Sequence, residues 1–176
     1  LNILLLDDIM EDRTTTTTTT ETATTTSPPV VLPGQKAVTK ITLSTPAMET
    51  QIPCSSALLD TTSIEYQNAA ANITSTLHPV LSASASSNGF IITDITIEYE
   101  CPTISGKRKR RSSSNALVKI TVEMESENPG VPTATIQSSV TTDIGTTQSG
   151  FLAPGVTISV TAIEEVIVVN VTTTTT

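Results

Sequence analysis

The stretch NALVKITVEME (residues 115–125) alternates apolar and polar side chains from Val118 onward. One side of it carries Ala116, Val118, Ile120, Val122 and Met124, and the other carries Lys119, Thr121, Glu123 and Glu125. A period of two with one polar side predicts a strand that buries one face and leaves the other in water.

The preceding stretch, FIITDITIEYE (residues 90–100), has the same character. We expect Ile91, Thr93, Ile95, Ile97 and Tyr99 on one side, and Ile92, Asp94, Thr96, Glu98 and Glu100 on the other. Two amphipathic strands so close in sequence predict an antiparallel hairpin. Its tip is the basic stretch SGKRKRRSSSN (residues 105–115).

Four further segments flank the hairpin. AVTKITLST (residues 37–45) alternates and is β-branched, which predicts a strand. The stretch 62–82 predicts a helix, in which Thr62 and Glu65 fit a capping box, and residues 131–151 predict a second helix. The run 155–171 is β-rich and predicts one strand or two. The expected apolar stripes are Tyr66, Ala70, Ile73, Leu77 and Leu81 in the first helix, and Ile136, Val140, Ile144, Thr147 and Phe151 in the second.

The element order β-α-β-β-α-β predicts an α+β fold of the ferredoxin-like kind, with a four-stranded antiparallel sheet. Two helices cover one face of the sheet, and the other face stays polar. If the closing run is divided into two strands, the break falls near Glu164 and Glu165.

The domain so predicted spans residues 36–171. Residues 1–12 form an apolar, strand-like segment, residues 13–35 a Thr/Pro-rich linker, and residues 172–176 the start of a second linker. The sequence begins without Met or a signal peptide, so we expect an excerpt or processed product of a longer chain.

Thr makes up about one residue in five, and most of the excess lies in the linkers. Such tracts bury too little apolar surface to fold, and with Pro they are typical of mucin-like stalks. The alternative is an unmodified flexible linker. The predicted O-glycosylation sites are Thr14, Thr15, Thr16, Thr17, Thr18, Thr19, Thr20, Thr22, Thr24, Thr25, Thr26, Ser27, Thr172, Thr173, Thr174, Thr175 and Thr176.

Two further signals indicate an extracellular protein, secreted or on the cell surface. Asn72 and Asn170 each begin an N-x-T sequon, and Asn72 lies away from the apolar stripe of its helix. The two cysteines, Cys54 and Cys101, predict one disulfide, and the alternative is two buried free thiols.

The basic run lies alone in a chain of net charge -8. A nucleic-acid patch needs flanking aromatic residues that this run lacks, a nuclear address conflicts with the sequons, and a solvated loop remains an alternative. Arg108, Lys109, Arg110 and Arg111, followed by Ser112, resemble the R-x-[KR]-R recognition sequence of furin-like convertases. The acidic subsites of those proteases need several basic side chains on an accessible segment, which a loop tip supplies.

The element order, the stretch NALVKITVEM after the hairpin and the closing GVTISVTAI together resemble a SEA domain. That resemblance implies an extracellular module found beside O-glycosylated tracts in membrane mucins, proteoglycans and adhesion receptors. Many SEA domains cut themselves between Gly and Ser at this hairpin. Here the position reads SSSNALVKI without a Gly-Ser pair, so we expect convertase cleavage to replace autoproteolysis.

Catalysis is not expected from this sequence, and neither a cofactor nor a metal site is predicted. His78, next to Pro79, suits a capping or surface role at a helix end. The acidic pairs 7–8, 11–12 and 164–165 fit solvated charge, and no phosphate loop or nucleophile motif occurs.

Two non-enzymatic functions follow. The first is a structural module of a fibre, matrix or glycocalyx, whose copies pair head to tail when residues 1–6 (LNILLL) add to an open sheet edge. The second is a cleaved ectodomain of a membrane mucin or adhesion receptor, acting in adhesion or shedding. The expected partners are copies of the chain and a furin-like convertase, with no nucleic acid, and membrane attachment of the parent chain is left open.

Overall fold

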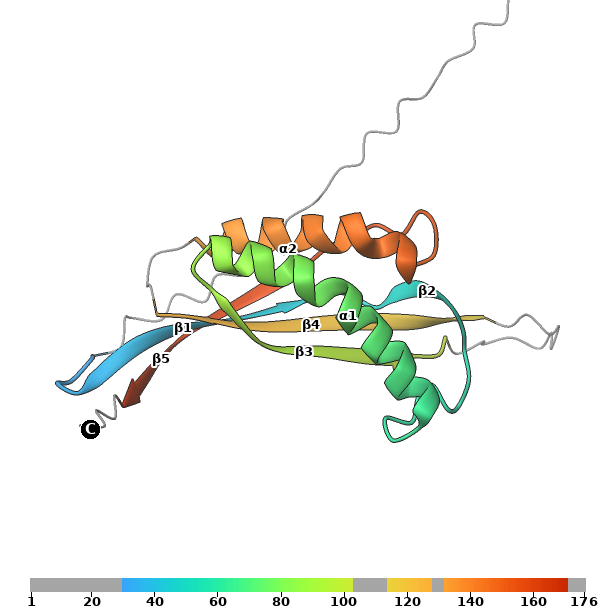
Figure 1. Ribbon diagram of the computed structural model, residues 1–176, viewed down its shortest axis with the longest axis horizontal. Coiled ribbons are helices and arrows are strands. Elements are labelled where there is room, and N and C mark those ends of the chain that lie inside the picture. The colour runs from blue at the N-terminus through green and yellow to red at the C-terminus, as the bar shows by residue number, and fades with distance from the viewer. Residues whose placement is uncertain (1–29, 103–113, 128–131, 171–176) are drawn as a thin grey trace, which may run out of the picture.

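The computed structural model describes residues 30–102, 114–127 and 132–170. The elements, in chain order, are strands β1 (Gln35–Ser44) and β2 (Met48–Pro53), helix α1 (Ile64–Ser87), strands β3 (Ile91–Glu100) and β4 (Asn115–Ser126), helix α2 (Thr133–Thr147), the 3₁₀ turn η1 (Gln148–Gly150) and strand β5 (Thr161–Asn170). Both helices cover the same face of the sheet (Figure 1). The predicted α+β class, with its antiparallel sheet and two helices, is confirmed.

The sheet is organised around β4. One edge of β4 pairs with β3, and its other edge pairs with β2 over its first residues and with β1 over its last ones. β5 pairs with the outer edge of β1, and every pairing is antiparallel. The sheet therefore has five strands where the sequence predicted four, because Met48–Pro53 forms a strand of its own.

The alternation predicted for β4 is confirmed. The five apolar residues predicted for its buried face are each at most 1% exposed, and Leu117 and the polar residues between them are half-buried on the opposite face. β4 is thus both the central strand and the main source of the core. The core on the helix side also takes up Ile41, Leu43 and Phe90, while Leu77 and Ile144 reach it from the two helices.

The prediction for β3 is wrong at its first two residues. The pairing with β4 shifts between Ile92 and Asp94, which makes Thr93 the extra residue of a β-bulge. A bulge exchanges the faces on either side of it, so Ile92 packs on the core while Ile91 is 74% exposed. From Ile95 onward the predicted faces hold, because Ile97 and Tyr99 are buried.

Helix α1 has the predicted apolar stripe, with Ile73, Leu77 and Leu81 buried. Its predicted capping box is wrong. The N-cap is Ser63, whose Oγ accepts a hydrogen bond from the Tyr66 amide at 3.0 Å. The Thr62 hydroxyl is engaged elsewhere, because it donates to the Asp60 carboxylate at 2.7 Å.

The other half of the predicted box also bonds elsewhere. Glu65 accepts a hydrogen bond from the Ser55 hydroxyl at 2.5 Å and does not reach back to the helix start. The helix also continues through His78 and Pro79, so the helix end predicted there is wrong. The surface role of His78 is confirmed, since its side chain is exposed.

In the last third of the chain, the predicted helix is too long, because α2 ends at Thr147 and η1 follows. Phe151 is buried in the core, but it lies beyond α2. Residues 155–160 are not a strand, and β5 runs through Glu164 and Glu165 without a break. The break predicted there is wrong because the two carboxylates use opposite faces of one strand. Glu164 accepts a hydrogen bond from the Thr133 hydroxyl at the start of α2, whereas Glu165 lies across from Lys40.

Candidate processing site at the β3–β4 connection

The predicted protease site, Arg108–Ser112, lies in the connection between β3 and β4, outside the described residues. Both ends of that connection are described. The last pair of the β3–β4 ladder is Glu100 with Leu117, so the two ends emerge side by side at one end of the sheet. A segment that joins two adjacent strand ends is a hairpin connection, as the sequence predicted.

Cys54 holds both ends of this connection. Its sulfur forms a disulfide with Cys101, with the two Cα atoms 5.7 Å apart, which confirms the predicted pairing. Its backbone N–H donates to the Ser114 carbonyl at 3.0 Å. Cys54 follows directly after β2, where Pro53 lies opposite Asn115. The chain is therefore fastened immediately before and immediately after the basic segment.

The position of the disulfide decides what a cut would leave. Cys54 and Cys101 both precede Arg108, so a chain cut after Arg111 has its only disulfide inside the N-terminal fragment. The two fragments would then be held together by noncovalent contacts alone.

Those noncovalent contacts include all the strand pairings of the described sheet. β1, β2 and β3 belong to the N-terminal fragment, whereas β4 and β5 belong to the C-terminal one. Within the described part of the chain, β4 pairs with β1, β2 and β3 alone, and β5 pairs with β1 alone. Among the described strands, no two from the same fragment pair with each other. Sequence reasoning missed this feature, because it depends on the order of strands across the sheet.

The core is divided in the same way. Ile41 and Leu77 come from the N-terminal fragment, and Ile120, Val122 and Ile144 come from the C-terminal one. Each of these residues is at most 1% exposed. Neither fragment carries the complete core, so separation of the fragments would expose the apolar surface that is buried between them.

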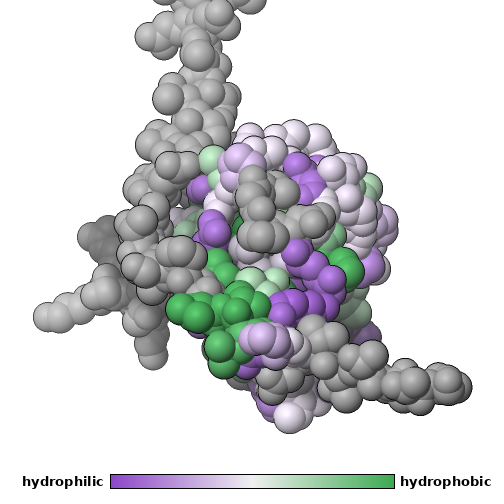
Figure 2. Space-filling view, turned by 90° about the vertical axis from the view of Figure 1, so that its left-hand side faces the viewer, coloured by the Kyte–Doolittle hydropathy of each residue, from purple (hydrophilic) through white to green (hydrophobic). Residues whose placement is uncertain are grey.

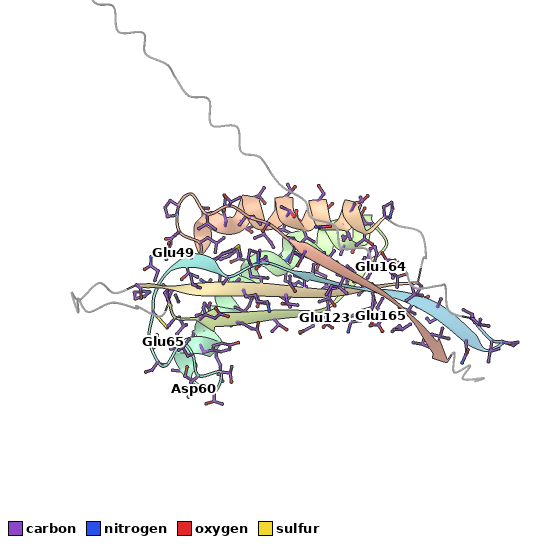
Figure 3. All side chains as sticks on the ribbon, turned by 180° about the vertical axis from the view of Figure 1, so that it is seen from behind. Glu49, Asp60, Glu65, Glu123, Glu164 and Glu165 are labelled. Atoms are coloured by element: carbon purple, nitrogen blue, oxygen red, sulfur yellow. A yellow bond between two sulfur atoms is a disulfide. The ribbon has the colours of Figure 1, made fainter. Side chains whose placement is uncertain are left out.

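The acidic residues at this end of the molecule are engaged in local structure. Glu49, Asp60 and Glu65 lie near the end of the sheet where β4 begins (Figure 3). Glu49 accepts a hydrogen bond from the Asn115 amide at 3.1 Å. The hydroxyl and backbone N–H of Thr62 both donate to Asp60, and these bonds lower the pKa of its carboxyl. Through these hydrogen bonds the acidic side chains stabilise turns and strand ends.

A pair of tyrosines packs beside the disulfide. The rings of Tyr66 and Tyr99 meet edge to face with centroids 5.8 Å apart, and the Tyr66 hydroxyl donates to the Ile97 carbonyl at 2.5 Å. The Tyr99 hydroxyl is buried without a hydrogen-bond partner among the described residues. Burial raises the pKa of Tyr99 to about 12, with a smaller contribution from Tyr66. The rings join α1 to the end of β3 nearest the processing site.

Of the two sequon asparagines, Asn72 is exposed in the middle of α1, away from the buried stripe, as predicted. Asn170 is the last residue of β5. The predicted O-glycosylation sites and the apolar segment 1–6 lie outside the described residues.

His78 has one polar neighbour, the Ser82 hydroxyl, 3.4 Å from its Nδ1. In the described ranges no three His, Cys, Asp or Glu side chains gather to hold a metal ion. No helix among these same residues has the length and apolar character to cross a membrane.

Comparisons with protein-family models, with curated proteins and with solved structures find no match to this chain.

Proposed function

We propose that this chain is a non-enzymatic, extracellular structural module of the SEA type. In this proposal a furin-like convertase cuts after Arg111, and the two fragments stay associated as one folded unit. The observation that carries the proposal is the division of the sheet, in which every strand pair joins one fragment to the other. Cleavage in the β3–β4 connection breaks a backbone bond without removing any of those pairs.

The strand order supports the ferredoxin-like part of the proposal. β1 and β2 lie along the same edge of β4, so together they occupy the place of the first strand. With that assignment the order across the sheet is β5, then β1 with β2, then β4, then β3. That order, with all neighbours antiparallel, is consistent with the proposed split β-α-β arrangement.

An extracellular setting is supported by the disulfide, since such bonds persist in oxidising compartments. The exposed sequon at Asn72 is consistent with it, because a glycan there would not disturb the core. The Thr-rich linkers on either side of the domain supply the mucin-like part of the proposal.

The cleavage step is tested by treating the full chain with a furin-type convertase. We expect two fragments on a denaturing gel without reductant, and their masses should place the cut after Arg111. Arg111→Ala should abolish the cut, whereas Lys107→Ala, which lies outside the R-x-[KR]-R pattern, should leave it intact. An uncut wild-type chain, or equal cutting of both variants, would contradict the proposal.

The second candidate function, a cleaved ectodomain that sheds under tension, is supported by the position of the two tethers. Gln35 at the start of β1 lies directly opposite Asn170 at the end of β5, so the chain enters and leaves the domain at one end. Tension on the two flanking linkers would therefore peel β5 from β1 one pair at a time. Single-molecule pulling should detach a cut domain into two pieces, and an uncut domain should refold when the force is released.

A further inference from the structure

The β1–β5 pair extends past the rest of the sheet. Thr39 with Ser126 is the last pair between β1 and β4, whereas β1 and β5 remain paired as far as Gln35 with Asn170. Beyond Thr39 the two strands form a ribbon at one end of the molecule (Figure 1). No described strand pairs with the outer edge of β5.

Apolar side chains predominate along this edge, although it also carries the exposed Glu164 and Glu165. Val166 is 38% exposed and Ile163 is 63% exposed, and Ile167, Val168 and Val169 are only half-buried. Figure 2 looks onto this end of the molecule and shows a patch of apolar surface there. A long apolar edge strand presents unpaired backbone N–H and C=O groups to any strand that matches it.

We propose that two copies of the chain associate through β5, antiparallel and side by side, with Ile167 on the two-fold axis. The two sheets then become one continuous sheet with the helices of both copies on the same side. A two-fold, isologous contact is the commonest geometry of soluble homo-oligomers.

The two glutamates of β5 exclude two of the possible registers. Continuity of both faces requires that inward residues lie opposite inward residues, which allows an axis on any single residue of β5. An axis on Glu164 or Glu165 sets like charges directly opposite each other, which destabilises a strand pair. An axis on Ile167 sets Glu165 opposite Val169 of the second copy and leaves no acidic side chain facing another.

The apolar residues fit the same register. On the helix side, Val166 lies opposite Val168 of the second copy, and the symmetric pair repeats it. On the outer side, Ile167 meets Ile167 of the second copy at the axis. Cross-strand pairs of β-branched side chains are among the stabilising contacts of antiparallel sheets.

On the outer face of the dimer, Lys36 lies in the same cross-strand row as Glu165 of the second copy. Lys36 lies opposite Val169 within one copy, so in the dimer the row across the sheet reads Lys36, Val169 and then Glu165 of the second copy. Lys36 already pairs with Glu127 at 2.5 Å and remains 42% exposed. An axis moved by one residue to Val166 also keeps like charges apart, but it sets Glu165 opposite Ile167 of the second copy. Ile167 lies across from the buried Val38, so that cross-strand row contains no cation.

In this proposal the strand that pairs with the outer edge of β5 is β5 of a second copy. It is not the segment 1–6 that the sequence suggested as a donor strand. A second β5 is favoured because its register follows from described residues: two Val–Val pairs, one Ile–Ile contact and the Lys36 row. The resulting contact also closes on itself and gives a dimer, whereas donor-strand exchange gives an open filament.

The test is sedimentation velocity on the full chain and on four variants. We expect a concentration-dependent dimer for the wild type. Val166→Glu alone and Val168→Lys alone should both be monomers, since each sets a charge against valine. An equimolar mixture of the two should recover a heterodimer, because the carboxylate introduced in one chain then faces the ammonium group introduced in the other, and the second pair remains Val–Val.

Two controls separate this proposal from its alternatives. Ile91→Lys changes an isoleucine that is about as exposed as Ile163 of β5. It lies on β3, the strand at the opposite edge of the sheet, so the variant should leave the dimer intact. Removal of residues 1–29 should also leave it intact. A wild-type monomer, failure of the mixture to associate while both variants keep their circular dichroism, or loss of association on removal of residues 1–29 would each overturn the proposal. None of these outcomes depends on cleavage.

Discussion

Replacement of Ile120 by alanine tests whether separation of the two fragments is the same process as unfolding. Ile120 is fully buried at the middle of β4, where it lies across from Ile97 of β3. Removal of its side chain beyond Cβ leaves a cavity in a close-packed core, and such changes lower the free energy of unfolding by about 2–5 kcal/mol.

The same loss should appear in the cut protein as weaker association of the fragments. Ile120 of the C-terminal fragment lies across from Ile97 of the N-terminal fragment, and the separated fragments retain none of the described strand pairs, so the contacts between Ile120 and the N-terminal fragment are lost on dissociation as they are on denaturation. A loss of about 2–5 kcal/mol corresponds to an increase in the dissociation constant of about thirtyfold to a few thousandfold.

The assay pairs urea denaturation of the uncut chain with dilution of the convertase-cut chain, monitored by analytical ultracentrifugation. Lys119→Ala is the matched control. Lys119 is the neighbouring residue on the polar face, 41% exposed and 3.3 Å from Glu98, so its loss should cost at most about 1 kcal/mol in both experiments. If Ile120→Ala destabilises the uncut chain but leaves the dissociation constant of the fragments unchanged, the reasoning is refuted.

Three further predictions concern the disulfide, the buried tyrosine and the helix cap. Joint replacement of Cys54 and Cys101 by serine should lower the unfolding free energy of the uncut chain by up to about 4 kcal/mol, since the disulfide closes a loop of 47 residues; urea denaturation measures it. The folded-state pKa of Tyr99 lies at about 12, above the ordinary value near 10, so stability should fall as pH rises from about 10 to 12. Tyr99→Phe should flatten that dependence in melts recorded across the range, and an unchanged slope would contradict the assignment. Ser63→Ala should cost about 1 kcal/mol through loss of the N-cap, and Thr62→Ala should cost clearly less; the reverse order would restore the predicted capping box.

The sequence predicted the features that depend on local periodicity. Every second residue of β4 from Ala116 to Met124 is apolar, and α1 repeats its apolar residues at helical spacing, so each buried face could be read from the chain itself. The disulfide followed from the count of two cysteines. The exposure of Asn72 followed from its place on the helix.

Features that depend on tertiary contacts were missed or mispredicted. The bulge at Thr93 is specified by the register against β4, and strand β2 is short and bounded by prolines, so neither gives a long periodic signal. Glu164 and Glu165 suggested a break because two adjacent charges rarely fit a buried strand. An edge strand tolerates both, because Thr133 and Lys40 lie on opposite faces to receive them.

The division of the sheet between fragments could not be read from the chain. Element order alone does not state which strands are neighbours, and the consequence of a cut depends on those neighbours. β4 is central because β1 and β2 both pair along one of its edges while β3 occupies the other.

The central claim is that the domain survives a cut in the β3–β4 connection as two noncovalently associated fragments. Native mass spectrometry of the convertase-treated chain, followed by the same measurement in denaturant without reductant, tests it most directly. We predict one species at the full mass plus one water under native conditions, and two fragments divided after Arg111 in denaturant. Separate fragments under native conditions, or one covalent species in denaturant after a confirmed cut, would contradict it.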